Sequence, residues 1–338
     1  MKKKWNRIIG VSLCTLLLLV STGFLGARYM PQRTGYGATW HMFLQEDTDS
    51  IDVLCLGASY AYCSTLPAQL YRQTGFTVYD LCAPQLTLQQ SYYYLREALQ
   101  TQSPHAVYLE ATGMFFDRYT DYTKVNIGYM PFGYNRLLAT FRAAEPQQRL
   151  GLLFPLYNYH DRWTEVPVNA LFAKRTDDAI DPWAGFTCLT EAQPQYGRGI
   201  RQDTLVRYRP QAYESALQTL TKIQALCAEK NIALYLYIAP AAEVLPQESL
   251  IRLVQSVQVL ALPLYDFNSG DRFAALSLDF AHDFYDPRHL NLFGAVKFSN
   301  ALAAQMCEDL AGFSPTPHDQ SLWENRVATL DDTLYAAN

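Results

Sequence analysis

The stretch DVLCLGASYAYCSTLPAQL, residues 52–70, joins a short apolar run to a turn and then to a helical pattern. Strands of a parallel sheet are near-continuous apolar runs, because helices cover both faces of the sheet. The stretch therefore predicts a strand that ends near Gly57 and a helix that begins soon after it. Ser59 stands in this turn, at the carboxyl end of the predicted strand.

The same alternation recurs along the chain and predicts an α/β fold. Strands separated by amphipathic helices favour right-handed crossovers and a parallel sheet that is covered on both faces. Residues 112–210 interrupt the alternation and are interpreted as an insertion over one edge of the sheet. Residues 312–338 are expected to form a loosely packed C-terminal extension. Strands are predicted at 51–57, 77–81, 106–111, 232–240 and 262–267, and helices at 66–74, 87–102, 211–230, 247–258 and 291–306.

The N-terminus has the pattern of a membrane anchor. Four basic residues within the first seven precede an uncharged run of 20 residues, Ile8 to Ala27, which is long enough for a bilayer core of about 30 Å. The positive charge predicts a cytoplasmic N-terminus at the cell membrane, with residues 1–28 as start and anchor, 29–50 as connector and an extracytoplasmic domain. A cleaved signal peptide shares these features and is the alternative.

Charge and cysteine content narrow the possible partners. Without the five basic residues of the anchor region, the 27 Lys and Arg fall to 22 against 32 Asp and Glu, a formal charge near -10. Nucleic acid is therefore not expected as a partner, and anionic wall polymers are disfavoured. Six cysteines lie outside the apolar run without CxxC spacing, so no metal site and no cofactor are expected. These cysteines either pair or are small buried side chains.

Ser59 has a candidate base far along the chain. Residues 284–299, FYDPRHLNLFGAVKFS, place Asp286 three residues before His289 at the entry of a helix. In a tight turn the carboxylate can accept from one imidazole nitrogen, which leaves the other nitrogen to take a proton from a serine. The alternative interpretation is that Ser59 and Asp286 are helix caps and that His289 is a surface residue.

Taken together, DVLCLGAS (52–59) and DPRHLNLFGAVKFS (286–299) resemble blocks of the SGNH/GDSL hydrolase superfamily. Residues 79–110 are similar to its second block, and FPLYNYHDRW (154–163) is similar to an inserted segment of a bacterial membrane-anchored branch. The resemblance covers residues 51–311. Its pattern is related to D-alanine transfer proteins and alginate-type O-acetyltransferase proteins.

The resemblance implies a flavodoxin-like three-layer α/β/α sandwich, with Ser59 as nucleophile, His289 as general acid and base, and Asp286 orienting the histidine. It implies an extracytoplasmic esterase or O-acyltransferase that uses an acyl donor and acts on a cell-envelope polysaccharide. Similar envelope proteins work beside a polytopic membrane-bound O-acyltransferase, so such a partner is expected. His160, Arg162 and Trp163 of the inserted segment are substrate-binding candidates; alternatively they anchor the insertion.

The sequence departs from the family pattern at the oxyanion hole. Ala58 stands where the family has a polar residue, and LEATGMFFD (109–117) lacks the expected asparagine. The replacement donors are the N–H groups of Ser59 and Ala83 and the side-chain amide of Gln85. A missing donor costs about 3 kcal/mol of transition-state stabilisation. The second hypothesis is therefore a non-catalytic glycan-binding or assembly protein with a degenerate site.

Overall fold

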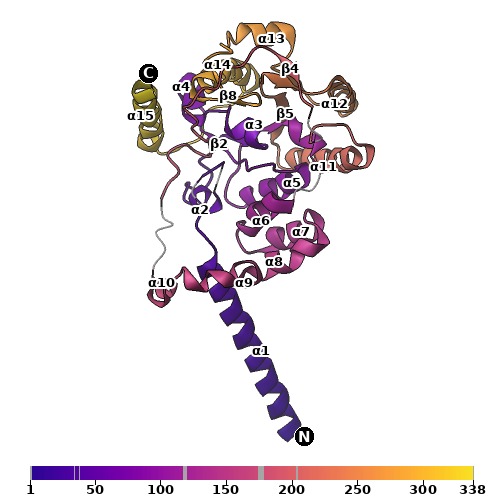
Figure 1. Ribbon diagram of the computed structural model, residues 1–338, viewed down its shortest axis with the longest axis vertical. Helices are drawn as coiled ribbons and strands as arrows, with labels where there is room; N and C mark the ends of the chain where they lie inside the picture. The colour runs from indigo at the N-terminus through magenta and orange to yellow at the C-terminus, as the bar shows by residue number, and fades with distance from the viewer. Residues whose placement is uncertain are drawn as a thin grey trace.

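The computed structural model describes residues 2–33, 35–37, 39–116, 120–173, 179–202 and 205–337. It is a mixed α/β structure around a five-stranded parallel sheet, and the apolar helix α1 (Lys2–Tyr29) projects from the domain (Figure 1). The α/β class predicted from the sequence is confirmed at this level.

The central sheet has the strand order β2-β1-β3-β5-β7, and all neighbouring strands are parallel. Each strand falls within one of the five predicted apolar runs. Every residue of the first three strands is buried, which accounts for the continuous apolar character of those runs. The strands are β1 (Val53–Leu56), β2 (Val78–Asp80), β3 (Ala106–Glu110), β5 (Ala233–Ile238) and β7 (Leu264–Asp266).

The five predicted helices are also present. The Thr87 hydroxyl accepts from the Gln90 N–H at the start of α5, and Asn291 Oδ1 accepts from the N–H groups of Phe293 and Gly294 at the start of α14. Helix α4 packs against α14, and α5 packs against α11. The helices are α4 (Pro67–Thr74), α5 (Leu88–Ala98), α11 (Pro210–Glu229), α12 (Gln247–Val259) and α14 (Leu292–Asp309).

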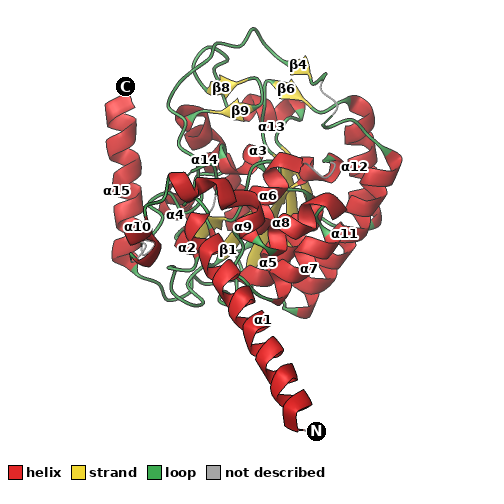
Figure 2. Ribbon diagram, turned by 60° about the horizontal axis from the view of Figure 1, so that its bottom comes forward, coloured by secondary structure: helices red, strands yellow, loops and turns green. Residues whose placement is uncertain are grey.

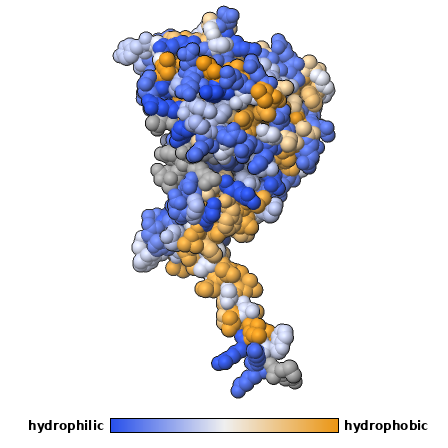
Figure 3. All heavy atoms as spheres, turned by 90° about the vertical axis from the view of Figure 1, so that its right-hand side faces the viewer, coloured by the Kyte–Doolittle hydropathy of each residue, from blue (hydrophilic) through white to orange (hydrophobic). Residues whose placement is uncertain are grey.

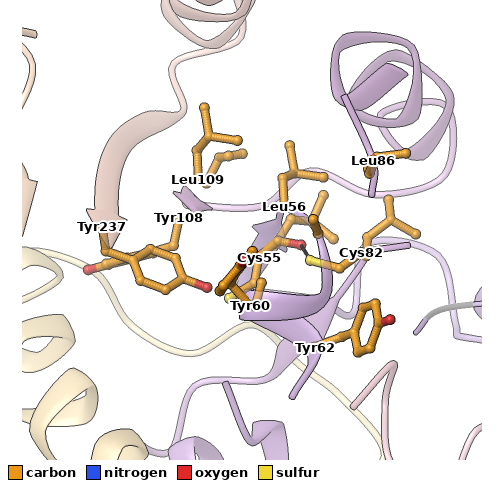
Figure 4. Packing of buried hydrophobic residues seen from close by; sticks show 14 of the residues in the cluster. Cys55, Leu56, Tyr60, Tyr62, Cys82, Leu86, Tyr108, Leu109 and Tyr237 are labelled. Carbon is orange, nitrogen blue, oxygen red and sulfur yellow. Dashed lines mark hydrogen bonds between the residues drawn. The ribbon is translucent and has the colours of Figure 1, made fainter. Parts of the chain in front are cut away.

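Buried side chains from β1 and from the loop after β2 meet beside the β1–α3 turn (Figure 4). Cys82 Sγ lies 2.7 Å from Asp80 Oδ1 and 3.6 Å from the backbone oxygen of Cys55. Cys63 and Cys227 are buried too, and the described cysteines are all free thiols. The interpretation of most cysteines as small buried side chains therefore fits the structure.

The insertion has two parts. In the first part, α7 packs on α5 and α9 packs on α1 (Figure 2). In the second part, Ala184 O accepts from the Asp80 N–H of edge strand β2, and the Thr187 N–H donates to Tyr62 O. The second part therefore lies against edge strand β2. The elements are η1 (Ala111–Phe115), α6 (Thr120–Gly128), α7 (Tyr134–Arg142), η2 (Pro146–Gln148), α8 (Arg149–Leu153), α9 (Pro155–Tyr159), η3 (His160–Thr164), α10 (Val168–Phe172) and β4 (Gly199–Ile200).

The C-terminal extension is firmly packed, so the expectation of a loose tail is wrong. Helix α15 (Gln320–Ala337) lies against α4 and buries Trp323, Arg326 and Leu330. Arg326 Nη2 lies 2.5 Å from Glu46 Oε1, and both side chains are almost fully buried. The sequence of α15 is largely polar, but one of its charged residues, Arg326, forms a buried ion pair.

The connector, residues 29–50, also belongs to the domain. Its short helix α2 (Trp40–Phe43) places Trp40 and Phe43 in the main core cluster. The remaining short elements are α3 (Ser59–Tyr62), β6 (Glu243–Val244), α13 (Gly270–Ala275), β8 (Phe284–Asp286) and β9 (His289–Leu290).

Candidate active site

The turn after β1 positions Ser59 as the first residue of α3. This turn is tight, because a Cβ atom added at Gly57 would lie 2.8 Å from Glu110 Cβ and 3.1 Å from Ala61 Cβ. A glycine is therefore required where the chain leaves the strand. The Ser59 side chain is partly exposed at the carboxyl edge of the sheet.

Asp286 and His289 lie on a small hairpin rather than in a simple helix-entry turn. Strands β8 and β9 pair antiparallel, and Asp286 is opposite His289. Asp286 Oδ1 accepts from the N–H groups of Arg288 and His289, at 2.7 and 2.9 Å. These bonds fix the orientation of the carboxylate, so that its other oxygen, Oδ2, faces the imidazole of His289. Asn291 then caps α14 directly after the hairpin.

The three predicted residues come together in one hydrogen-bonded chain. His289 Nε2 lies 2.8 Å from Ser59 Oγ, and His289 Nδ1 lies 2.8 Å from Asp286 Oδ2. With Nδ1 protonated and donating to the carboxylate, Nε2 is free to accept the Ser59 hydroxyl proton. This is the arrangement that activates a serine nucleophile.

The electrostatics of the hairpin keep Asp286 ionised. Partial burial alone would raise the pKa of Asp286, but the His289 hydrogen bond and charge and the two backbone N–H groups lower that pKa below its ordinary value. A carboxylate in this state stabilises an imidazolium when His289 receives a proton.

A second Asp–His pair has the same spacing and a different environment. His282 Nδ1 lies 2.8 Å from Asp279 Oδ2, yet the exposed fractions of these side chains are 76% and 52%. Those of His289 and Asp286 are 20% and 29%. The spacing alone therefore does not single out the pair that meets Ser59.

Sequence reasoning missed Tyr60, which lies beside the imidazole, and Arg201, which lies over the Tyr60 ring. The Tyr60 ring stacks on His289, with ring centroids 5.4 Å apart, and the Arg201 guanidinium lies 5.1 Å from the Tyr60 ring centroid. Both side chains are buried. Tyr60 thus limits the movement of His289. Its position next to Ser59 was a signal, whereas nothing local in the sequence points to Arg201.

One of the three oxyanion-hole candidates already has a hydrogen-bond partner. The Ala83 N–H donates to Gly57 O at 3.3 Å, so this donor already has an acceptor. Gln85 has φ 44°, and its buried Oε1 has no hydrogen-bond partner among the described residues. The Ser59 N–H, at the first position of α3, has no acceptor within the helix. Of the three candidates, the Ser59 N–H is the one that belongs to Ser59 itself.

Glu110 is the last residue of β3 and lies in the segment in which an asparagine donor was expected. Its carboxyl group accepts from the Thr112 N–H and hydroxyl, at 3.1 and 2.6 Å. Complete burial raises the pKa of Glu110 to about 7, although bonds from Thr112 and from the Ala239 N–H oppose the rise. Both Thr112 donors are thereby directed to Glu110. A glutamate inside the apolar run AVYLEA was the sequence signal for this buried acid.

The structure does not bring His160, Arg162 and Trp163 to the Ser59 turn. They form η3, which packs on α1 and α9, and Arg162 Nη1 lies 2.5 Å from Tyr29 O at the end of α1. In Figure 1, α9 lies where the domain meets α1, whereas α3 lies in the other half of the domain. The anchoring alternative fits this placement, and the substrate-binding expectation at Ser59 does not.

The described residues contain no group of three or more His, Cys, Asp or Glu side chains that could hold a metal ion. Comparison of the sequence with protein-family models gave no match, and comparison with curated proteins gave none either.

Proposed function

We propose that this chain is an SGNH-type serine esterase or O-acyltransferase that forms an acyl intermediate on Ser59. One observation carries the proposal: the Ser59 hydroxyl, the His289 imidazole and the Asp286 carboxylate form a continuous hydrogen-bonded chain. The resemblance of the sequence blocks around these residues to the SGNH superfamily supports the same reaction class.

The chemistry divides into two balanced halves. Ser59 Oγ attacks an ester carbonyl while its proton passes to His289 Nε2, and the departing alcohol takes that proton as the carbonyl–oxygen bond breaks. An acceptor hydroxyl then gives its proton to His289 and attacks the acyl-serine carbonyl, and His289 returns the proton to Ser59 Oγ as the acyl–Oγ bond breaks. Water as acceptor completes an ester hydrolysis, and a sugar hydroxyl completes an acyl transfer.

A flavodoxin-like three-layer sandwich is the finer fold that we propose. The strand order β2-β1-β3-β5-β7 corresponds to the 2-1-3-4-5 order of doubly wound sheets. The α4–α14 and α5–α11 pairs are consistent with helix layers on two faces. In such sheets ligands bind beyond the carboxyl ends of the strands, where Ser59 lies.

We further propose a single-pass protein with its N-terminus in the cytoplasm and its domain outside. Residues Lys3–Tyr29 form a helix that is long and apolar enough to cross a membrane. The basic residues before the apolar run favour this orientation. The family resemblance adds a cell-envelope glycan as acceptor and a polytopic membrane-bound O-acyltransferase as partner.

The second candidate function is a non-catalytic glycan-binding or assembly protein. The oxyanion region favours it, because the Ala83 N–H is bonded to Gly57 O and both Thr112 donors are bonded to Glu110. Without stabilisation of the oxyanion the triad would work slowly.

A fluorophosphonate probe separates the two functions. Intact-protein mass spectrometry of the full chain in detergent should show one adduct, which is lost in Ser59→Ala and strongly reduced in His289→Ala. Ser269→Ala is the matched control, because this serine is exposed and bonded only locally to Asp266 O. Absence of labelling in a chain with an intact thermal transition would support the binding protein instead.

A further inference from the structure

The base of the insertion exposes a cluster of large apolar side chains next to α1. Six of them occur between residues 150 and 172, with exposed fractions of 42–74%. We call this cluster the collar. Its members are Leu150 of α8, Phe154 between α8 and α9, Tyr157 of α9, Trp163 of η3, and Val168 and Phe172 of α10.

The collar is fixed to the last turns of α1. A Cβ atom added at Gly26 would lie 2.7 Å from the Leu156 backbone N, so α9 approaches the helix closely. The ring centroids of Phe24 and Phe172 are 6.0 Å apart. Arg28 Nη1 also donates to Ala173 O at 2.9 Å. These contacts hold the collar at one level along the helix.

That level is the outer end of the apolar run. The run from Ile8 to Ala27 contains 20 residues, which span about 30 Å as a helix, the thickness of a bilayer core. The attachment points therefore lie where α1 leaves the hydrocarbon. In Figure 3 the apolar surface of α1 continues onto the base of the domain.

The composition of the collar suits a lipid interface better than water. Tyr157 and Trp163 have amphipathic rings, which concentrate at the headgroup level, and their neighbours are fully apolar. Buried at this level, each apolar side chain would contribute to membrane attachment in proportion to the area removed from water.

We propose that the collar rests in the outer interface of the bilayer and holds the domain at a fixed height and tilt. The proposal depends on the membrane anchoring proposed above for α1. Anchor and domain then move as one body, because the chain enters the domain through packed contacts rather than through a free linker.

Nitroxide labels on the full chain test this placement. In a Cys14→Ser, Cys307→Ser background, which removes the two exposed thiols, single cysteines replace Val20 in α1, Val168 in the collar and Val259 on α12. All three side chains are exposed, with Val259 as the matched control away from α1. Collisions with oxygen and with a water-soluble nickel chelate are measured by electron paramagnetic resonance in phosphatidylcholine–phosphatidylglycerol liposomes.

We expect the label at residue 20 to lie in hydrocarbon, the one at 168 to be shielded from nickel, and the one at 259 to be fully accessible. Equal nickel accessibility at 168 and 259, with residue 20 still in hydrocarbon, would overturn the collar and leave the anchor standing. A membrane-embedded protein, rather than lipid, would then be the better candidate for covering the collar. A nickel-accessible label at residue 20 would overturn both the anchor and the collar.

Discussion

Asp286 uses both carboxylate oxygens within the hairpin, one on backbone N–H groups and one on His289. An asparagine would retain one acceptor and turn an N–H₂ donor toward a partner that also donates. Asp286→Asn should therefore disturb the tautomer of His289, and the rate of fluorophosphonate labelling should fall at least about 100-fold. Stopped-time labelling followed by intact-mass analysis measures this rate.

The Asp279–His282 pair provides the control for this substitution, since its spacing and its 2.8 Å contact are the same. Asp279→Asn should leave the labelling rate unchanged. Equal losses in the two variants would mean that the effect arises from the fold of the segment and not from the histidine.

Glu110 should make stability depend on pH. Its folded-state pKa is about 7 and its ordinary value is 4.5, so the folded protein keeps the proton longer than the unfolded chain. The associated stability is complete below pH 4.5 and is lost as pH rises to 7, by about 3 kcal/mol. Glu110→Gln cannot ionise and should remove this part of the pH dependence.

Urea unfolding at several pH values between 5 and 8 measures the effect. The difference in unfolding free energy between Glu110→Gln and wild type should shift in favour of the variant as pH rises. A difference that stays constant across this range would show that Glu110 is not the titrating group.

At the scale of single residues, the sequence predicted the triad but not the surroundings of the triad. Ser59, Asp286 and His289 could be found because each occurs in a recognisable local pattern. Arg201 contacts Tyr60, which is distant in the chain, whereas the signal for Glu110 was a glutamate inside an apolar run. Ala83 was wrongly expected as a free donor, because its bond to Gly57 O depends on how the loop after β2 folds.

At the scale of elements, Arg326 ties α15 to the segment after α2 through a buried pair with Glu46. Removing only the arginine would leave a carboxylate buried without its counter-charge. Arg326→Ala should therefore lower the unfolding free energy by about 3–5 kcal/mol, measured by urea denaturation. A Glu46→Gln, Arg326→Met double variant should recover part of the loss, because the Glu46 charge is removed together with its partner, whereas buried Asp181 still loses the Arg326 charge.

Arg72 and Asp331 form a more exposed ion pair between α4 and α15, with N–O 2.5 Å. Arg72→Ala should cost less than about 1 kcal/mol, because solvent screens the pair. If both arginine variants cost the same, burial of the Glu46 pair is not what stabilises α15.

The elements of the sheet were predictable because burial on both faces leaves a continuous apolar run in the sequence. Helix α15 was missed for the opposite reason: it buries Arg326, whose partner Glu46 lies 280 residues away, so its pattern looks like a solvated tail. The first part of the insertion likewise has only short helices, and three of them, α9, η3 and α10, pack against α1. The local hydrophobic pattern of the sequence predicts neither the burial of α15 nor the packing of the insertion on α1.

At the scale of the whole molecule, α1 and α3, the helix that begins with Ser59, lie in different halves of the domain. Helix α1 packs against α9, η3 and α10, whereas α3 lies in the half of the domain away from α1 (Figure 1). Because α1 and α3 are apart within the plane of this view, they are also apart in space. If α1 and the collar lie in the bilayer, Ser59 therefore opens into the aqueous phase above it, and a donor or acceptor must reach it there.

This placement predicts that membrane insertion leaves the chemistry of Ser59 unchanged. A water-soluble fluorophosphonate should label the full chain at the same rate in detergent micelles and in liposomes, within about twofold, because neither the serine nor its approach contacts lipid. Val168→Asp, in the collar, and Val259→Asp, on α12, should both leave this rate unchanged. A labelling rate that falls several-fold in liposomes would place the entrance to Ser59 against the bilayer, and the substrate would then arrive from within the membrane.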